Sequence, residues 1–407
     1  MDNLTHSLAG LAAGELLQQT LAREPDAASH SSRRRMLLVA CWAANNFPDL
    51  DLLLRGRLPK PLDYLLDHRG HTHTLLYALP QALLIAALVW LLWPGARGLL
   101  RVSAAARTGL AWAIGLGLCM HLGMDFLNSY GMHPFYPFDA RWFYGDTLFI
   151  VEPVLWIAFG APLAMMLPRR WVRIAVAALM AAVFGLSLSR GLLAWGSVLG
   201  LGAAGVGLAW RQRRSGAASR QGLMAGVVLA LAFVSLECWL SAQAKRVIAA
   251  DLLRQDPAMR VLDIAMTPLP GNPLCWSFAS VARASAGPVY ELRRGMYSAA
   301  PTLMPVAACP AGLSTPGQAA TAQLGYAWTG RFALAKLRAL ALTCRGNAWL
   351  RFARMPAIGE HEASDARFGA PAGQNFTTID TDGIALLPCP GGVPQWGFPR
   401  ADLLNGG

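Results

Sequence analysis

The chain has 407 residues, of which 55% are hydrophobic and only 14% are charged. Because a soluble domain averages roughly 25% charged residues, this composition argues against an ordinary soluble protein. The net charge of +12 would by itself suggest a nucleic-acid partner, but it comes mainly from arginines in short stretches between apolar runs. Short loops rich in Arg and Lys stay on the cytoplasmic side of a membrane, so topology accounts for the charge and no nucleic-acid partner is predicted.

In chain order, two stretches that are short or only weakly apolar come first, Leu4–Leu21 and Met36–Phe47, and both are predicted to be helices buried in a bundle. Asp2 and Glu15 precede the first arginine, Arg23, which argues against a cleavable signal peptide. About 20 apolar residues suffice to cross a bilayer. Runs of about this length are Thr74–Trp93, Thr108–Leu127, Thr147–Leu167, Trp171–Leu188, Leu192–Trp210 and Gly222–Leu240.

The arginines between these runs predict how the helices cross the membrane. Placing their loops in the cytoplasm puts the start of the first helix, near His6, outside, together with everything after about Lys245. The chain is therefore predicted to lie in the inner (cytoplasmic) membrane of a bacterium, with a periplasmic or extracellular C-terminal domain. The loop arginines are Arg33, Arg34, Arg35, Arg97, Arg101, Arg107, Arg169, Arg170, Arg173, Arg211, Arg213, Arg214 and Arg220.

The predicted fold is mainly α: a polytopic helical membrane bundle over residues 1–244, followed by an extracytoplasmic α+β or β-rich domain over residues 245–407. In the second part, apolar stretches such as Val289–Leu292 and Leu337–Thr343 alternate with turn signals such as Pro268–Pro273. An even number of cysteines in an oxidising compartment is consistent with two disulfides of open connectivity. These cysteines are Cys275, Cys309, Cys344 and Cys389.

Ionisable side chains gather at the end of the bundle that is predicted to face outward. Such groups are costly at membrane depth, so their convergence suggests one shared site. Alone, His6 would more often be an ordinary histidine of a helix core. The histidines are His6, His68, His71, His73, His121 and His133, and the acidic residues are Asp49, Asp51, Asp125, Asp146 and Glu152.

Three local motifs carry the chemistry. His121 and Asp125 are spaced i and i+4 within an apolar helix, which places both on one face as a pair of good zinc ligands. A hydrogen-bonded pair that joins helices is the alternative. The segment Asp67–His73 holds three histidines, and the alternative there is a solvated polar loop. In Asn45–Asp51 two carboxylates follow Pro48, and the alternative is a simple helix cap.

Together these motifs resemble the YdjM-like family of membrane-bound metal-dependent hydrolases. The resemblance rests on the opening MDNLTHSLAG, the FPDLD turn, HRG-x-TH and HLGMD, and on DTLFIVEP as in longer members. It covers residues 1–170 firmly and the remainder loosely. His71 departs from the family pattern, which favours His68 and His73 over it as ligands, and Glu152 stands where an Asp is commoner.

A more distant resemblance links the chain to zinc-dependent phospholipase C and related single-strand nucleases, which are helical and bind clusters of zinc. An early His, an Asp, a lone His and a His-x-x-x-Asp pair occur here in that order. The resemblance implies a multi-zinc phosphoesterase, and we predict one to three zinc ions. The ligands that we predict are His6, Asp49, Asp51, His68, His73, His121 and Asp125.

The sequence thus predicts a hydrolase in which a metal-activated water attacks a lipid or lipid-linked phosphoester. Asp49 or Asp51 would hold or deprotonate the water, and Arg69 would steady an anionic substrate oxygen. A zinc-dependent membrane peptidase is one alternative, although the His-Glu-x-x-His signature is absent. A metal-ion or proton transporter is another, although the inner halves of the Thr108–Leu127 and Thr147–Leu167 helices are apolar. The third is a structural membrane protein without metal.

Overall fold

A computed structural model describes the chain except residues 55, 217, 285–286, 314–316, 370–374 and 406–407. The described residues form two compact units, each assembled from separated stretches. The helical unit comprises Met1–Leu50, Thr72–Leu127 and Phe149–Leu236. The mixed unit comprises Asp51–His71, Asn128–Leu148 and Glu237–Gly407. The predicted domain division at residues 244 and 245 stays a prediction.

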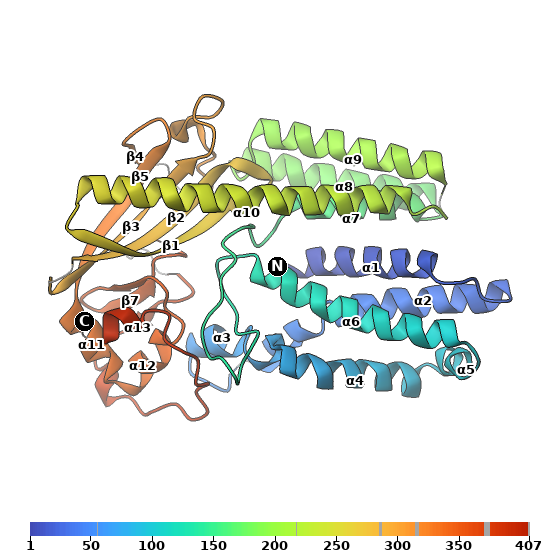
Figure 1. The fold of residues 1–407 in the computed structure, drawn as a ribbon, viewed down its shortest axis with the longest axis horizontal. Helices are drawn as coiled ribbons and strands as arrows, with labels where there is room; N and C mark the ends of the chain where they lie inside the picture. The colour runs from blue at the N-terminus through green and yellow to red at the C-terminus, as the bar shows by residue number, and fades with distance from the viewer. Residues whose placement is uncertain (55, 217, 285–286, 314–316, 370–374, 406–407) are drawn as a thin grey trace. The chain divides into compact units, whose positions relative to one another are not determined.

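The helical unit is built almost entirely from α-helices (Figure 1). α1, α2 and α6 pack closely, with Met36, Leu37, Ala113 and Ile114 in a buried core. A Cβ on Gly117 of α6 would lie 2.6 Å from the Cβ of Ala44, so this close approach requires glycine. The helices are α1 (Asn3–Thr20), α2 (Ala27–Ala44), α4 (Leu75–Leu92), α5 (Pro94–Val102), α6 (Ala104–Phe126), α7 (Pro153–Met166), α8 (Arg170–Ser189), α9 (Trp195–Ser215) and the first part of α10 (Gln221–Gln255).

Side-chain caps set where the important helices begin. The Asp2 carboxylate accepts hydrogen bonds from the first turn of α1. Thr74 and Ser103 do the same for α4 and α6. Such caps satisfy backbone N–H groups that have no partner within the helix. The cap at Thr74 fixes the start of α4 directly after His73, a residue of the candidate site.

Among the described residues, four helices are long and apolar enough to cross a membrane, by length and composition: α4, α6, α8 and α10. Their mean hydropathies are 2.2, 1.3, 2.0 and 2.1. Two of the six predicted spans, Thr147–Leu167 and Leu192–Trp210, are not among these four. α7 begins only at Pro153 and has 14 residues, which is about 21 Å of helix at 1.5 Å per residue, short of the roughly 30 Å hydrocarbon core. The mainly helical membrane fold is confirmed.

The mixed unit contains an antiparallel sheet with the strand order β1-β2-β3-β5-β4. The last turns of α10 pack on this sheet, where Ile248 and Leu252 contact a core that includes Trp276 and Phe278. Gly271, at a φ of +56°, forms the turn between β1 and β2 inside the predicted turn segment. The strands are β1 (Met259–Leu269), β2 (Asn272–Ala284), β3 (Val289–Ser298), β4 (Gln318–Ala319) and β5 (Leu324–Ala333).

Short helices and a second sheet complete the mixed unit. Trp349, Tyr290 and Leu65 belong to its largest buried core. Disulfides join Cys275 to Cys309 and Cys344 to Cys389, which confirms the two predicted disulfides and the sheet-rich C-terminal part. The elements are η1 (Pro48–Leu54), α3 (Leu62–Asp67), η2 (His71–His73), η3 (Val306–Ala308), α11 (Leu334–Ala341), α12 (Cys344–Leu350), β6 (Pro356–Ile358), β7 (Glu362–Asp365), β8 (Ile379–Asp380), η4 (Ile384–Leu386) and α13 (Ala401–Leu404), with η1 and η2 each beginning or ending in the helical unit.

Candidate metal centre

Four buried side chains of the helical unit bring potential metal ligands together: Asp49, His73, His121 and Asp125. One nitrogen or oxygen from each lies within 4.8 Å of the others. These residues come from three elements that are far apart in the sequence. Asp49 lies in η1 after the end of α2, His73 precedes α4, and the other two lie on α6. The i and i+4 spacing on α6 places its two side chains on one face, as the sequence indicated.

The distances between these donor atoms match the edges of a small tetrahedron. The two imidazole Nε2 atoms of His73 and His121 are 3.0 Å apart. His73 Nε2 lies 3.5 Å from Asp49 Oδ1 and 3.2 Å from Asp125 Oδ2, and His121 Nε2 lies 3.7 Å from each of these oxygens. A tetrahedral zinc ion with ligand distances near 2.0–2.1 Å has edges of about 3.3 Å. The donor set therefore fits one zinc-sized ion at its centre.

Hydrogen bonds hold the two histidines with their Nε2 atoms directed at each other. His121 Nδ1 lies 2.9 Å from the backbone carbonyl of Asn45, and a carbonyl can only accept. Nδ1 of His121 therefore carries the proton, and its Nε2 has a lone pair. His73 Nδ1 lies 3.0 Å from the Thr72 hydroxyl. Metal-ligating histidines are commonly oriented in this way by a partner on the other ring nitrogen.

His6 extends this cluster. Its Nε2 lies 3.2 Å from Asp125 Oδ1, and its ring stacks on that of His121 with the centroids 4.1 Å apart. The Asn45 amide donates to the backbone carbonyl of His6 at 2.6 Å. Asn45 thus ties two of the helices that carry the cluster, through its side chain to α1 and through its carbonyl to α6.

Two further groups at the cluster had not been predicted. Asn3 donates its amide to Asp49 Oδ2 at 3.1 Å, which orients that carboxylate. The α-amino group of Met1 is buried and pairs with Asp125 Oδ1. The orienting residues Asn3, Asn45 and Thr72 were missed because small polar residues near helix ends usually serve as caps. The Asn45 contact to His121 also uses a backbone carbonyl, which leaves no signal in the sequence.

Asp51, His68 and Arg69 form a separate local arrangement in the mixed unit. His68 Nδ1 lies 3.0 Å from Asp51 Oδ1, and the backbone N–H of Arg69 donates to Asp51 Oδ2 at 3.0 Å. Arg69 has a φ of +56°, and its guanidinium donates to Asn128 Oδ1 at 2.8 Å. Asp51 thus holds the turn that separates α3 from η2, and Arg69 is buried.

The other two histidines at the predicted outer end belong to an aromatic cluster of the mixed unit. His133 lies between Trp142 and Trp396, with ring centroids 3.9 and 4.2 Å away. His71 lies 4.9 Å from the same Trp396 ring. Burial, followed by the nearby charge of His71, lowers the pKa of His133 to about 3. These surroundings keep His133 neutral and pack it as an apolar ring.

Asp146 and Glu152, for which the sequence left the role open, have structural partners. The two oxygens of Asp146 accept from Arg354 at 2.7 and 2.8 Å, and Lys245 approaches at 2.6 Å. Glu152 caps α7 by accepting from the backbone N–H of Val154 at 3.1 Å. Both carboxylates thus make contacts that stabilise the fold.

The fold and this cluster define a class: a helical membrane protein with a candidate metal centre buried among its helices. Comparison with known proteins identifies a family that the N-terminal half of the chain matches. Residues 1–198 match the family described as YdjM inner membrane protein, which confirms the resemblance inferred from the motifs and supports an inner-membrane location.

One relative of this segment is a protein of Bacillus subtilis (strain 168) that is described as the uncharacterized protein YfhP. It is 27% identical over 165 residues, which cover 40% of this chain and 46% of YfhP. The matched segment therefore spans about half of that relative. No solved structure matches the chain significantly.

Proposed function

We propose that this chain is a membrane-embedded, metal-dependent hydrolase that holds zinc between Asp49, His73, His121 and Asp125. One observation carries the proposal: five separations among their donor atoms lie between 3.0 and 3.7 Å, near the edges of a zinc tetrahedron. Without a metal, the contact between the two Nε2 atoms would be a hydrogen bond in which one imidazole donates, whereas a metal ion would let both Nε2 atoms present lone pairs.

The donor set favours zinc over the common alkaline-earth ions. Magnesium and calcium prefer shells made of oxygen, whereas imidazole nitrogens suit zinc and other transition metals. When bound, zinc would supply a water whose pKa is lowered towards about 7. The four residues account for one zinc ion. The sequence predicts one to three zinc ions, and we propose that any further ion would bind near His6.

The carboxylates supply the proton-handling groups of the proposal. Asp49 directs Oδ1 towards the two histidines, while Asn3 holds its Oδ2. A catalytic zinc ion keeps one position for water, so His73, His121 and Asp125 would hold the ion, and Asp49 would hold the water at the fourth position and accept its proton. Asp51 follows two residues later in η1, and we propose it as a second carboxylate that could hold or deprotonate the water. Arg69 stays in it as a guanidinium for an anionic substrate oxygen, a role that needs it to leave Asn128.

The place of the cluster along the helices supports a substrate from the bilayer. His73 directly precedes α4, and Asp125 lies in the last turn of α6, so the cluster is at the ends of two candidate membrane spans. A lipid or lipid-linked molecule presents its polar group at this depth. The order of the ligands, similar to that in zinc-dependent phospholipase C, favours a phosphoester.

A substrate panel tests this proposal. Protein in detergent or nanodiscs would be incubated with phospholipids, polyprenyl phosphates and peptides, with and without added zinc. We expect zinc-dependent release of phosphate or a phosphorylated headgroup, and a loss of at least about 100-fold in Asp49→Asn, consistent with a group that acts in proton transfer. Asp382→Asn, which alters an exposed carboxylate, is the matched control. Zinc-dependent peptide cleavage without phosphoester turnover would establish the peptidase alternative instead.

We also propose that the C-terminal domain lies outside the cytoplasm. The two disulfides support this, because such bonds persist in oxidising compartments. The arginine-rich loops support the same orientation. Reporter fusions provide the test: a fusion after Arg213 should report cytoplasm, and one at the C-terminus should report periplasm or exterior. A cytoplasmic C-terminus would reverse the orientation of every span.

A further inference from the structure

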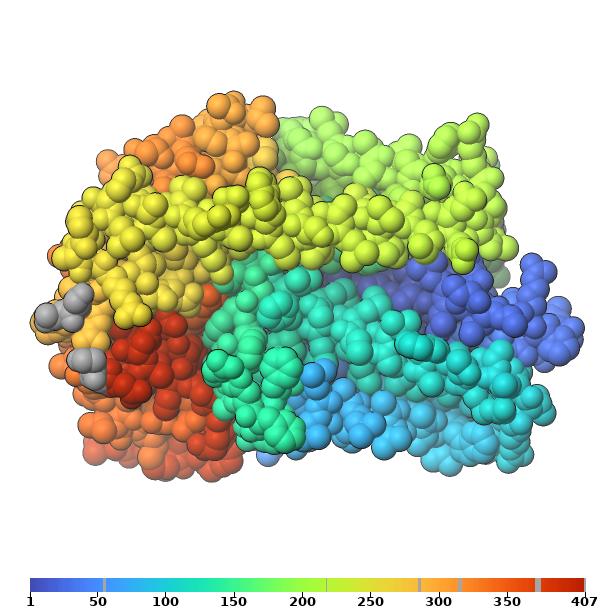
Figure 2. Space-filling model, in the orientation of Figure 1, coloured from blue at the N-terminus to red at the C-terminus, as the bar shows by residue number. Residues whose placement is uncertain are grey.

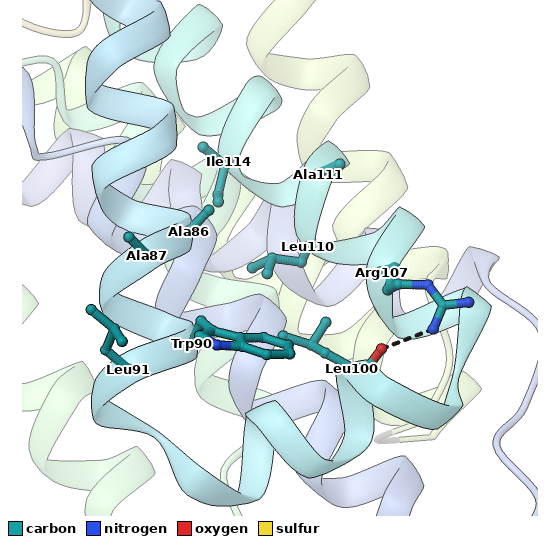
Figure 3. Close-up of a pocket in the computed structure, with 9 residues that line it drawn as sticks. All are labelled: Ala86, Ala87, Trp90, Leu91, Leu100, Arg107, Leu110, Ala111 and Ile114. Atoms are coloured by element: carbon teal, nitrogen blue, oxygen red, sulfur yellow. Dashed lines mark hydrogen bonds between the residues drawn. The ribbon is translucent and has the colours of Figure 1, made fainter.

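An apolar groove lies between α4, α5 and α6 of the helical unit. Its volume is about 590 Å³, within the range of small-molecule sites. Ala86 and Trp90 of α4, Leu100 of α5, and Leu110 and Ile114 of α6 line it, and Arg107 is its charged lining residue (Figure 3). An apolar channel with one cationic end has the chemistry of an amphiphile site.

The groove opens on a surface that faces lipid if α4 and α6 cross the bilayer, as their length and composition allow. Trp90 is 39% exposed and Leu91 is 64% exposed beside it. Figure 2 shows the continuous outer surface that α4, α5 and α6 form, coloured from blue to cyan. The groove is thus open to molecules that arrive from the membrane.

The connecting helix α5 is suited to the membrane interface. It buries Ala96, Leu99 and Leu100 towards the bundle, while Arg101 is exposed and Arg97 is half-buried. A short helix with an apolar face and a basic face lies along the boundary between headgroups and acyl chains. With α5 at this boundary, the groove mouth would lie at headgroup depth and its apolar walls at acyl-chain depth.

Arg107, which lines the groove, and Arg101, which lies next to the lining residue Trp90, are held in place by contacts within the helical unit. Arg107 donates NH1 to the Leu100 carbonyl at 2.8 Å, which fixes its guanidinium at the rim of the groove, beside Leu100 (Figure 3). The Arg101 guanidinium lies 5.6 Å from the centre of the Trp90 ring, a cation–π contact. Guanidinium groups bind phosphate oxygens in a bidentate manner, so each of these two side chains is suited to pair with a phosphate.

We propose that this groove is a binding site for an anionic glycerophospholipid from the surrounding bilayer. An acyl chain lies against the apolar walls, and the phosphate pairs with Arg107 and Arg101. The net negative charge of the lipid complements the two guanidinium groups. The site is distinct from the candidate metal centre, because Trp90 and Arg107 lie at the opposite ends of α4 and α6 from His73 and Asp125. The proposal therefore does not depend on the hydrolase function.

Native mass spectrometry of the full chain in detergent tests this site. Phosphatidylglycerol and phosphatidylcholine with identical acyl chains would be titrated separately, with glycerol phosphate as a probe for the headgroup alone. We expect phosphatidylglycerol to bind at least about fivefold more tightly than phosphatidylcholine, and glycerol phosphate not to bind. Arg107→Gln should weaken phosphatidylglycerol about tenfold, the effect of losing a charge-assisted hydrogen bond.

Two variants distinguish lipid binding in the groove from a non-specific attraction of anionic lipids to surface arginines. Ala111→Phe fills the groove while leaving both arginines in place, and it should weaken both lipids. Arg211→Gln removes one exposed arginine of α9 that does not line the groove, and it should leave binding unchanged. Equal binding of the two phospholipids, or equal effects of Arg107→Gln and Arg211→Gln, would overturn the proposal. So would unaltered lipid binding by a monodisperse Ala111→Phe protein.

Discussion

The two units of the molecule balance buried acidic groups in different ways. In the mixed unit, Arg354 binds Asp146 and Asp263 together, with four hydrogen bonds of 2.7 to 2.9 Å. In the helical unit, Asp49 and Asp125 instead lie against imidazole nitrogens, and Asp125 also pairs with the Met1 α-amino group. A guanidinium keeps its charge and its protons at all physiological pH values, whereas a neutral imidazole offers a lone pair. The first arrangement is complete in itself, and the second is suited to take up a cation.

In the mixed unit, the pKa shifts of Asp263 and Arg354 show that each of these groups stabilises the charge of the other. Burial alone raises the pKa of Asp263, but the adjacent Arg354 outweighs this and holds that pKa well below its ordinary value. For Arg354, burial likewise opposes the charge, and Asp146 and Asp263 raise its pKa well above the ordinary value. Asp263 and Arg354 are thus held in their charged forms, and Arg354 hydrogen-bonds to both Asp263 and Asp146.

The largest effect is therefore expected from Arg354→Met. It leaves the buried Asp146 with Lys245 and the half-buried Asp263 with Arg400 as their remaining cations. Because breaking a buried pair costs about 3–5 kcal/mol of unfolding free energy, we expect a loss near the lower end of that range. Arg141→Gln is the control, because its pair with Asp139 is exposed and such pairs contribute about 0–1 kcal/mol. Denaturant titration of the full chain, followed by tryptophan fluorescence, provides the measurement. Equal costs for the two variants would contradict a charge-balanced network in the mixed unit.

In the helical unit, substitutions in the candidate metal centre should lower the amount of bound zinc. We expect purified protein to carry about one zinc equivalent at this set, and the double variant His121→Ala, Asp125→Ala to lose most of it, with affinity at least about 100-fold lower. Elemental analysis measures the content, and His361→Ala, an exposed histidine paired with Asp382, is the control. Metal-free wild-type protein whose stability does not change with a chelator would show that this cluster only joins helices.

A smaller effect is expected from the residue that orients His73. Thr72→Val removes the hydroxyl at 3.0 Å from His73 Nδ1 while keeping the side-chain shape. Loss of such an outer contact weakens metal binding about 10-fold or more. Competition with a chromophoric chelator would measure it. Unchanged affinity would mean that the ring of His73 is held by packing alone.

Much of the helical unit was predictable because its signals are long and periodic. The runs Thr74–Trp93 and Thr108–Leu127 match α4 and α6 to within a few residues. α5 was not predicted: nine residues with two arginines were interpreted as a loop, because a short amphipathic helix has no long apolar run. α10 extends beyond the predicted end at Leu240 because its last turns, though polar in sequence, pack on the sheet.

The candidate site was predictable in its members but not in its grouping. The i and i+4 pair on α6 placed His121 beside Asp125 through helix geometry alone. No local rule could choose among His68, His71 and His73, since a tight turn at Gly70 sends each in a different direction. His68 contacts Asp51, whereas His73 joins the four-residue cluster, and only tertiary packing decides this. That these residues bind a metal stays a prediction.

The smallest predicted effect concerns His133, the histidine of the mixed unit that contrasts with the proposed ligands. It is fully buried between Trp142 and Trp396, and its pKa falls to about 3 in the folded protein. An unfolded histidine has a pKa near 6.5, so between these values the unfolded state binds a proton that the folded state does not. Stability therefore decreases as the pH falls below about 6.5.

Lowering the pH from 7.5 to 5.5 should cost wild-type protein about 1 kcal/mol more than it costs His133→Phe, which keeps an aromatic ring between the two tryptophans but cannot be protonated. Other titrating groups are common to both proteins and cancel in this difference. Denaturant titrations at the two pH values, followed by tryptophan fluorescence, report on the rings that enclose residue 133. Identical pH dependence in the two proteins would mean that His133 accepts a proton in the folded state. His133 would then be a basic imidazole like those proposed to bind zinc in the helical unit, and not a ring kept neutral by packing.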